Sequence, residues 1–339
     1  PTSASGMTYY RGDQFPEAYR QDVFVAEPAG NVVVQLRLMR KDLDLSTDHI
    51  LYEDEKWGER EFLASTDERF RPVDVDVGPD GALYVVDMYR GIIQDQIFLS
   101  DELRAQALLR GLDEPIGMGR IWRITAAEGK LKAAQPQFSS NGRKLLKHLE
   151  SNNGWVRDTA QRLLILTKGR GIDRGLRRLA AGDNELAAVH AIWTLEGRGT
   201  LNRRTLTKAL DNDSGMIQLA AVRAGYKLLS AEALLRLATQ SDHSSISHHA
   251  TMYLADSNRR DDVIEHLVNS LLKNDPGGLE RMAIQAASLG NELALIDAIT
   301  AKGWNQTNEK PAHFIKDLIS QSFRASPKNS VNLLGYVMK

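Results

Sequence analysis

The 339-residue chain contains no cysteine. This excludes disulfides, thiolate metal sites, thiol nucleophiles and covalent haem attachment within this stretch of chain. No apolar run approaches the roughly 20 residues that a membrane-spanning helix needs, and the start does not resemble a signal peptide. Because the chain begins at Pro1 directly with strand-like sequence, we expect it to be cut from a longer natural protein, in which there is room for a targeting segment upstream.

A strong charge of either sign is also missing. Lysine and arginine (43) nearly balance aspartate and glutamate (44), so no electrostatic field favours a polyanion, and nucleic acid is not expected as a partner. Hydrophobic residues make up 42% and charged residues 26% of the chain, as in ordinary globular proteins. The length allows two domains, each with its own core.

Short strands joined by tight turns are predicted for the first part of the chain. Val23–Val25 and Val32–Val34 flank a turn with proline, glycine and asparagine. In Phe70–Val77 the valines alternate with aspartates, a period of two that places them on opposite faces of a strand. Gly78–Gly81 then turns the chain and Leu83–Val86 returns it.

Such hairpins are marginal alone and must lean on others, which favours the blades of a β-propeller. Arg120–Ile124 fits the outer strand of the last blade. Between them, Ser100–Gly111 is predicted to form an inserted helix, with Ser100 as its cap and Gly111 at its end.

Helix signals replace strand signals after about Pro136. Leu145–Leu164, Leu176–Leu195 and Leu206–Leu228 can be superposed, with leucine spacings of 30 and 31 residues. A looser copy runs over Leu234–Leu254, and further helical stretches are predicted at 263–272, 279–289 and 314–319. A helical hairpin of this size cannot bury its apolar stripe alone, so we expect the copies to stack as a HEAT-like α-solenoid.

The predicted architecture is therefore multidomain, with β followed by α structure. Residues 1–128 are expected to be late blades of a six-bladed β-propeller, 129–142 a linker, and 143–339 the helical solenoid.

Two segments of the first part resemble the soluble aldose-sugar dehydrogenases of the glucose/sorbosone type. They are Ser5–Pro16 and the hairpin Val77–Val85. That family consists of six-bladed propellers that bind pyrroloquinoline quinone (PQQ) and calcium. Asp87–Gln94, Arg110–Pro115 and Gly119–Ile124 are similar in particular to bacterial membrane-bound or quinoprotein-type dehydrogenases, in which HEAT repeats and usually a c-type cytochrome domain follow the propeller.

The resemblance implies cofactor contacts in these blades from a lysine, two arginines and a threonine. The corresponding residues here are Ala29, Arg71, Val73 and Asp87, so only Arg71 is carried over as a cofactor-binding residue. Arginine suits the three carboxylates of the quinone because it pairs with carboxylates in a bidentate way. The family's catalytic histidine and most of its calcium ligands belong to earlier blades, so this chain offers no catalytic residue and no metal ligand by resemblance.

A possible rim of ligand-binding residues surrounds Arg71. A carboxylate, a phenol and a guanidinium close together at a blade's end suit a polar ligand. The candidates are Tyr9, Arg11, Asp74, Asp87, Tyr89 and Arg90. The alternative is that Arg71 and Asp87 form a structural ion pair between strands.

The histidines carry less weight. His243, His248 and His249 lie in a serine-rich loop and helix start without a carboxylate at metal-ligand spacing, so a metal site is not expected there. His49 stands in a polar linker as a weak candidate for a general base.

Two functions remain open. The first is the C-terminal part of an extracytoplasmic, periplasmic quinoprotein-type dehydrogenase that oxidises sugar-like alcohols or hemiacetals and passes electrons to a c-type cytochrome domain or protein. PQQ and calcium would be bound in the full-length protein, and c-type haem in a downstream domain. The second is a non-catalytic propeller and HEAT scaffold that binds carbohydrate or protein. The first follows from resemblance, which is a weaker warrant for chemistry than for fold. The loss of the lysine, one arginine and the threonine favours the second.

Overall fold

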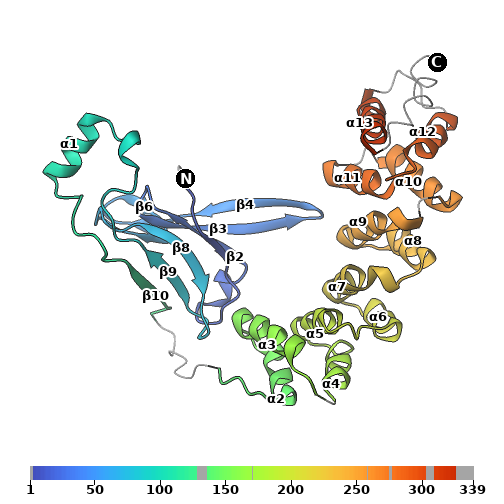
Figure 1. Cartoon of the computed structure of the whole chain (residues 1–339), viewed down its shortest axis with the longest axis horizontal. Coiled ribbons are helices and arrows are strands. Elements are labelled where there is room, and N and C mark those ends of the chain that lie inside the picture. The colour runs from blue at the N-terminus through green and yellow to red at the C-terminus, as the bar shows by residue number, and fades with distance from the viewer. Residues whose placement is uncertain are drawn as a thin grey trace. The chain divides into compact units, whose positions relative to one another are not determined.

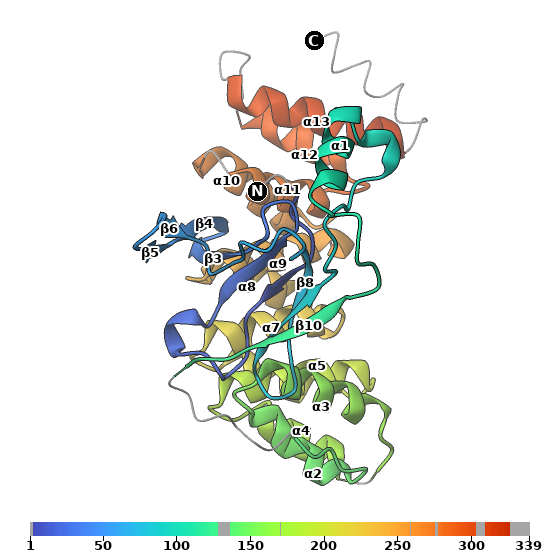
Figure 2. The same ribbon diagram turned by 90° about the vertical axis from the view of Figure 1, so that its left-hand side faces the viewer.

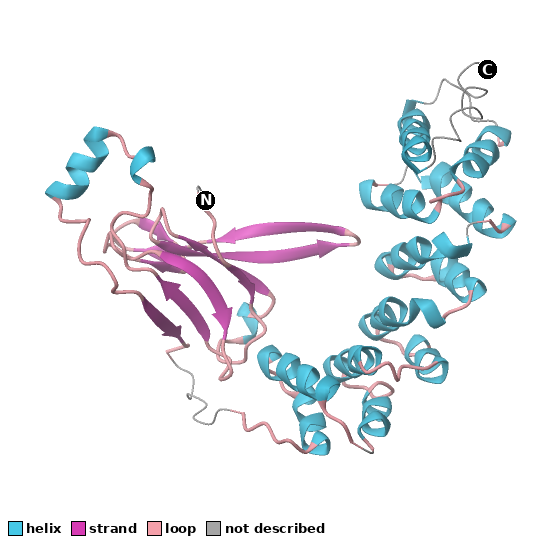
Figure 3. Ribbon diagram, in the orientation of Figure 1, coloured by secondary structure: helices cyan, strands magenta, loops and turns pink. Residues whose placement is uncertain are grey.

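The computed structural model describes residues 3–127, 136–169, 171–257, 259–274, 277–302 and 309–325. Strands dominate the first part of the chain and helices the remainder, so the fold combines β and α structure (Figures 1 and 3). The chain divides into two compact units, residues 1–172 and residues 173–339. The expected linker 129–142 falls partly outside the described residues, as do the last 14 residues of the expected solenoid, 326–339.

The strands form three antiparallel sheets. Their order is β1-β2-β3-β4 with β7 beside β3, then β8-β9-β10, and a small pair β5-β6. The strands are β1 (Met7–Tyr9), β2 (Asp22–Glu27), β3 (Val32–Lys41), β4 (Asp44–Ile50), β5 (Tyr52–Asp54), β6 (Gly58–Arg60), β7 (Leu63–Ala64), β8 (Pro72–Val77), β9 (Leu83–Asp87) and β10 (Arg120–Ile124).

Helix α1 lies among the strands, and all the other α-helices follow β10 in the chain. The α-helices are α1 (Asp101–Leu109), α2 (Gly142–Leu146), α3 (Gly154–Leu166), α4 (Ile172–Leu179), α5 (Glu185–Gly197), α6 (Arg203–Leu210), α7 (Gly215–Gly225), α8 (Ala231–Gln240), α9 (Ser244–Met252), α10 (Asp261–Asn274), α11 (Gly278–Ala287), α12 (Glu292–Ala301) and α13 (Glu309–Ala325). Short 3₁₀ helices are η1 (Glu17–Tyr19), η2 (Gln96–Phe98), η3 (Lys147–Glu150), η4 (Tyr226–Leu228) and η5 (Tyr253–Ser257).

The hairpin of β8 and β9 follows from its alternating sequence. Val75 and Val77 are buried while Asp74 and Asp76 are exposed, as the period of two predicts. Gly81 has a φ of +81°, a conformation that favours glycine, and Asp13 lies where a side chain on Gly81 would have to go. The predicted hairpin and its turn are confirmed.

The two larger sheets share one apolar core. Phe24 and Val33 of the first sheet pack in the same buried cluster as Val75, Leu83 and Val85 of the second. Packing the two sheets together removes these apolar side chains from water. This burial stabilises the packed sheets by roughly 25 cal/mol for each Å² of apolar surface buried.

One part of the first sheet was not expected. The supposed polar linker around His49 is strand β4, in which His49 pairs with Leu36 of β3. Its residues are mostly exposed and polar, so the alternation of apolar and polar residues that predicts a strand is missing from its sequence. With β3 it forms a long two-stranded ribbon (Figure 1).

The inserted helix is confirmed as α1. The Ser100 hydroxyl accepts a hydrogen bond from the Leu103 N–H at 3.3 Å and so caps its start. Gly111, just past its end, has a φ of +62°. In the turned view, α1 stands away from β8 and β10 (Figure 2).

The helical hairpins also lie where the leucine spacing predicted them. The second helices of successive copies, α3, α5 and α7, begin at Gly154, Glu185 and Gly215. In the second unit α5 packs on α7, α7 on α9, and α9 on α11, which gives one continuous layer. Small buried side chains let these helices approach one another: Ala187, Ala191, Ala220 and Ala221. The predicted stretches near 263–272, 279–289 and 314–319 fall in α10, α11 and α13.

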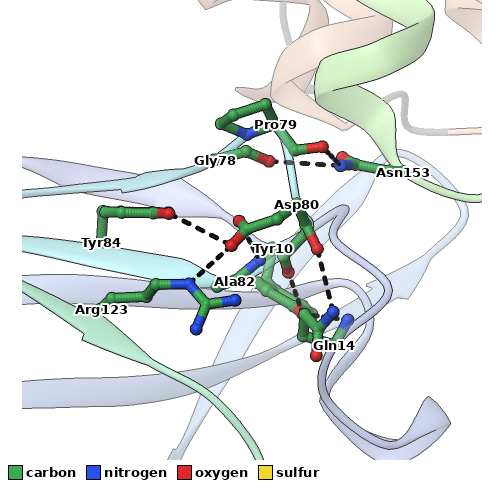
Figure 4. Close-up of polar contacts among 10 residues, drawn as sticks. Tyr10, Gln14, Gly78, Pro79, Asp80, Ala82, Tyr84, Arg123 and Asn153 are labelled. Atoms are coloured by element: carbon green, nitrogen blue, oxygen red, sulfur yellow. Dashed lines mark hydrogen bonds and ion pairs between the residues drawn. The ribbon is translucent and has the colours of Figure 1, made fainter. Parts of the chain in front are cut away.

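The tip of the β8–β9 hairpin is joined to the start of α3 (Figure 4). The Asn153 side chain, only 3% exposed, donates to the carbonyls of Gly78 at 3.2 Å and Pro79 at 3.0 Å. Its oxygen accepts from the Trp155 N–H at 3.0 Å and so caps α3. One asparagine therefore caps the start of the helix and holds the turn.

The same turn is held from the β1 side. The Tyr10 hydroxyl donates to the Gly81 carbonyl at 2.7 Å, and the Gln14 amide donates to the Asp80 carbonyl at 3.1 Å. The Asp80 carboxylate in turn accepts from the Tyr84 hydroxyl at 3.2 Å and from Arg123 of β10 at 2.6 Å (Figure 4). These bonds fix the turn to the segment after β1 and to β10.

Replacing Asn153 by aspartate tests this joint. Aspartate keeps the helix cap but loses both donors to the turn, so we expect Asn153→Asp to lower the free energy of unfolding by about 1–3 kcal/mol. Asn184→Asp is the matched control, because Asn184 caps α5 through the Ala187 N–H and is itself exposed. The control should change stability by less than about 0.5 kcal/mol. Equal effects of both variants in urea unfolding would contradict the joint.

Candidate functional site

The strongest polar cluster of the first unit centres on Asp87, the last residue of β9. Its side chain is buried, with 1% of the residue exposed. One carboxylate oxygen accepts from the N–H groups of Arg71 and Tyr89, both at 2.9 Å. The other accepts from Arg120 Nε at 2.8 Å and from Trp122 Nε1 at 3.0 Å. We call these five residues the Asp87 cluster.

The electrostatics of Asp87 follow from these contacts. Burial by itself raises the pKa of the carboxyl, but the hydrogen bonds from Arg71, Arg120, Trp122 and Tyr89 outweigh burial and lower it below its ordinary value. Asp87 is therefore ionised at neutral pH, and its charge is compensated by Arg120.

The Arg71 guanidinium does not pair with Asp87. It donates to main-chain carbonyls instead: those of Pro28 at 2.7 Å, Arg90 at 2.9 Å and Gly91 at 2.8 Å. The expected ion pair between Arg71 and Asp87 is therefore wrong. The main-chain N–H of Arg71 donates to Asp87, and the ion pair of Asp87 is with Arg120. Burial lowers the pKa of Arg71. This direction agrees with a guanidinium that is bound by neutral carbonyls and not by carboxylates.

Arg71 consequently links the two larger sheets, at the end where β9 finishes and the turn between β2 and β3 lies. Pro28 belongs to the turn between β2 and β3, whereas Arg90 and Gly91 follow β9. Each of the three nitrogens of the guanidinium donates one of these bonds. The residue carried over as a cofactor contact thus serves as a structural clamp.

An aromatic and cationic surface lies over the cluster. The Arg120 guanidinium sits 3.9 Å from the ring centre of Tyr89 and 4.5 Å from that of Trp122. The side chain of Arg120 is 39% exposed, so this stack faces solvent. Tyr89 has a φ of +49°, which is strained for a bulky residue and is held by its N–H bond to Asp87.

The other predicted site residues do not join this cluster. Arg90 contributes a carbonyl to Arg71, and Asp74 is an exposed strand residue whose carboxylate accepts from the Val75 N–H at 2.9 Å. Arg11 forms an ion pair with Asp158 of α3, near the opposite end of the β8–β9 hairpin. Tyr9 lies beside Arg11, which lowers its pKa less than burial raises it.

Arg120 and Trp122 were missed as site residues, although their strand was predicted. Their place follows from strand register, because Arg120 pairs directly with Asp87 across β9 and β10. The sequence did contain a signal for them. Arg120 and Trp122 stand two positions apart on a strand expected to pair with the strand that ends in Asp87.

Segments that are separate in sequence meet around this end of the sheet. Arg69 donates to the carbonyls of Gly111 at 2.7 Å and Glu114 at 3.1 Å. Gly91 lies so close to Leu112 that a side chain on it would clash. The stretches 87–94, 110–115 and 119–124 therefore form one local structure.

Among the residues that the structure describes, no group of three or more histidine, aspartate or glutamate side chains is placed to hold a metal ion. Across the same described ranges, no helix combines the length and apolarity needed to traverse a bilayer.

The first part of the chain matches a family of known sequences. Residues 1–128 match the family described as "Domain of unknown function (DUF7133)". No curated protein matches the chain. No solved structure matches it either.

Replacing Asp87 by asparagine tests the buried carboxylate. We expect Asp87→Asn to lower the free energy of unfolding at pH 7 by about 2 kcal/mol, because hydrogen bonds to a charged group are lost. Asp76→Asn, on the exposed face of the same hairpin, is the control and should be near neutral.

The same pair of proteins has a predicted pH dependence. The folded pKa of Asp87 is lowered, so its contribution is complete above the unfolded value of about 3.9 and is lost as the pH falls through the folded value. The stability gap between wild type and Asp87→Asn should therefore narrow below about pH 4. A gap that widens on acidification in urea titrations would contradict the assignment.

Substitutions at Tyr89 test the strained backbone. Both Tyr89→Gly and Tyr89→Ala remove the ring from Arg120, but only glycine adopts a positive φ without a steric penalty. We expect the glycine variant to be more stable than the alanine variant by about 1 kcal/mol. Thermal unfolding compares the two directly, and an alanine variant of equal or greater stability argues against strain.

Proposed function

We propose that the chain is the late-blade and helical-spacer part of an extracytoplasmic quinoprotein-type dehydrogenase. Such an enzyme oxidises sugar-like alcohols or hemiacetals and passes electrons to a c-type cytochrome domain or protein. The observation that carries the proposal is the convergence of 87–94, 110–115 and 119–124 around the Asp87 cluster. These are the segments whose sequence resembles that group, and their specific residues make the contacts.

The strand arrangement supports late propeller blades within this proposal. β8, β9 and β10 form an antiparallel meander in chain order, as do β1 to β4, and the two sheets pack face to face on one core. Meanders of this kind, packed side by side, are the blades of propellers. Two sheets would be two of the six blades, so the remaining blades would come from elsewhere in the protein.

The helices support a HEAT-like solenoid as the spacer. Within the second unit, α5, α7, α9 and α11 form one layer in which each helix contacts the next. Stacked repeats of this kind give an elongated support with extended surfaces. In the proposed enzyme, the support would hold the cytochrome partner.

The residues present do not fit the quinone cofactor. Three of the four expected contact positions hold Ala29, Val73 and Asp87, and Arg71 is engaged with three carbonyls. PQQ with calcium would supply hydride acceptance and Lewis acidity, but from blades outside this chain. The residues described here would keep the sheet edges fixed beside such a site.

A second candidate is a scaffold without redox chemistry that binds carbohydrate or protein. The structural engagement of Arg71 favours it, because the one retained cofactor residue serves the fold. The exposed stack of Tyr89, Arg120 and Trp122 would then be part of a binding face.

A cofactor titration separates the two candidates. A protein that joins this chain to the earlier blades is titrated with PQQ and calcium, and dye reduction by aldoses is followed. Saturable binding with turnover is expected for the dehydrogenase; neither binding nor turnover would leave the scaffold. The 339-residue chain alone is the control and should not bind PQQ, since Arg71 is already engaged.

A further inference from the structure

The second unit contains a cavity of about 400 Å³ among α8, α9, α10 and α11. Ten of its thirteen lining residues are polar, although the buried core beside it consists of leucine, isoleucine, valine, alanine and phenylalanine. Stacked helical repeats need an apolar interior for stability. This cavity lies beside that apolar interior and is lined mainly by half-buried polar side chains.

Two helices each turn a polar stripe toward this cavity, and a third contributes one carboxylate. On α9 the stripe is Ser244, Ser247, His248 and Thr251; on α10 it is His266, Asn269 and Ser270; α11 contributes Glu280. Residues three and four positions apart lie on one face of a helix, so these side chains converge instead of scattering over the surface.

One of these groups is a buried imidazole nitrogen without a partner. His248 Nδ1 is buried and makes no hydrogen bond to the residues that the structure describes. On the facing helix, His266 Nε2 lies 3.2 Å from the Thr251 hydroxyl. Burial lowers the pKa of both histidines, so both rings are neutral at pH 7 and each carries one donor and one acceptor nitrogen, although His266 Nε2 is engaged with Thr251.

Some lining groups retain capacity for a ligand. The Ser247 hydroxyl donates to the Ala238 carbonyl at 2.6 Å, so its lone pairs remain to accept. One carboxylate oxygen of Glu280 accepts from the Gly277 N–H at 3.2 Å, and the Asn269 oxygen accepts from Lys302 at 2.9 Å. The amide nitrogen of Asn269 is a further donor.

The lining chemistry selects among ligands. Among the described residues that line the cavity there is no lysine or arginine, so a phosphate or carboxylate group would lack the cation that usually pairs with it. The same described lining holds no phenylalanine, tyrosine or tryptophan, so a nucleobase would lack a stacking partner. Hydroxyl, imidazole and amide groups that donate and accept match a molecule rich in hydroxyls. The volume lies in the lower part of the range of about 300–1,000 Å³ for small-molecule pockets.

We propose that this cavity binds a small neutral polyhydroxylated molecule, of the size of a monosaccharide or a cyclitol. His248 and His266 hydrogen-bond its hydroxyls from opposite helices, and Glu280 accepts from a third position. The proposal does not rest on the proposed function, because the cavity lies wholly within residues 238–284 of the second unit.

Isothermal titration of the full chain with D-glucose and with myo-inositol tests the proposal. Saturable binding of at least one of them is expected, with glucose 6-phosphate bound at least about tenfold more weakly than glucose because the lining offers no cation. Binding of neither compound, or tighter binding of the phosphate ester, would overturn the proposal.

Variants locate the binding. His248→Leu should weaken it by about tenfold or more, the effect of losing a hydrogen bond in a buried site. His249→Leu is the matched control: His249 is the next residue on α9, bonds the Ser245 carbonyl at 2.8 Å and does not line the cavity. Equal weakening by both variants would overturn the assignment.

A milder variant protects the test against misfolding. Ser270→Ala removes one lining hydroxyl with little change in volume and should weaken binding by about threefold or more, while circular dichroism stays that of wild type. Wild-type affinity in both Ser270→Ala and a folded His248→Leu would place the ligand elsewhere and end the proposal.

Discussion

The buried carboxylate of Asp87 is the constraint on which the first unit depends. An ionised group with 1% exposure is tolerated only when its oxygens are hydrogen-bonded, and here four donors satisfy them. Those donors come from the chain before β8, from the turn after β9 and from β10. One side chain thereby fixes three segments, and the clamp of Arg71 on carbonyls adds the neighbouring sheet.

The polar side chains of the candidate site in the first unit therefore serve mainly to hold the fold together. Of the four contact positions that the family resemblance pointed to, only Arg71 keeps the expected residue type, and its guanidinium holds main-chain carbonyls. At the other end of the same hairpin, Asn153 joins the turn to α3 by the same means, polar side chains that satisfy main-chain carbonyls. A rigid platform of this kind suits either a dehydrogenase whose chemistry lies on other blades or a scaffold.

Local patterns predicted most of the fold, because period, caps and turns act over a few residues. The valine and aspartate alternation gave β8, Ser100 and Gly111 bounded α1, and the leucine spacing placed the helices. Non-local pairing was out of reach. The exposed strand β4 lacks an apolar face, and the partners of Asp87 and Arg71 depend on strand register and on carbonyl positions that no residue type reveals. His248 was set aside as a metal ligand, and its place in a polar cavity depends on stacking between repeats.

Hydrogen exchange of the Arg71 side chain, followed by nitrogen-15 NMR, tests most directly whether this residue belongs to the fold. The Nε–H proton, bonded to the Arg90 carbonyl at 2.9 Å, should exchange slowly, and its resonance should not move when PQQ is added. Fast exchange in the isolated chain, or a resonance that shifts on saturation with the quinone, would contradict the structural role assigned to Arg71.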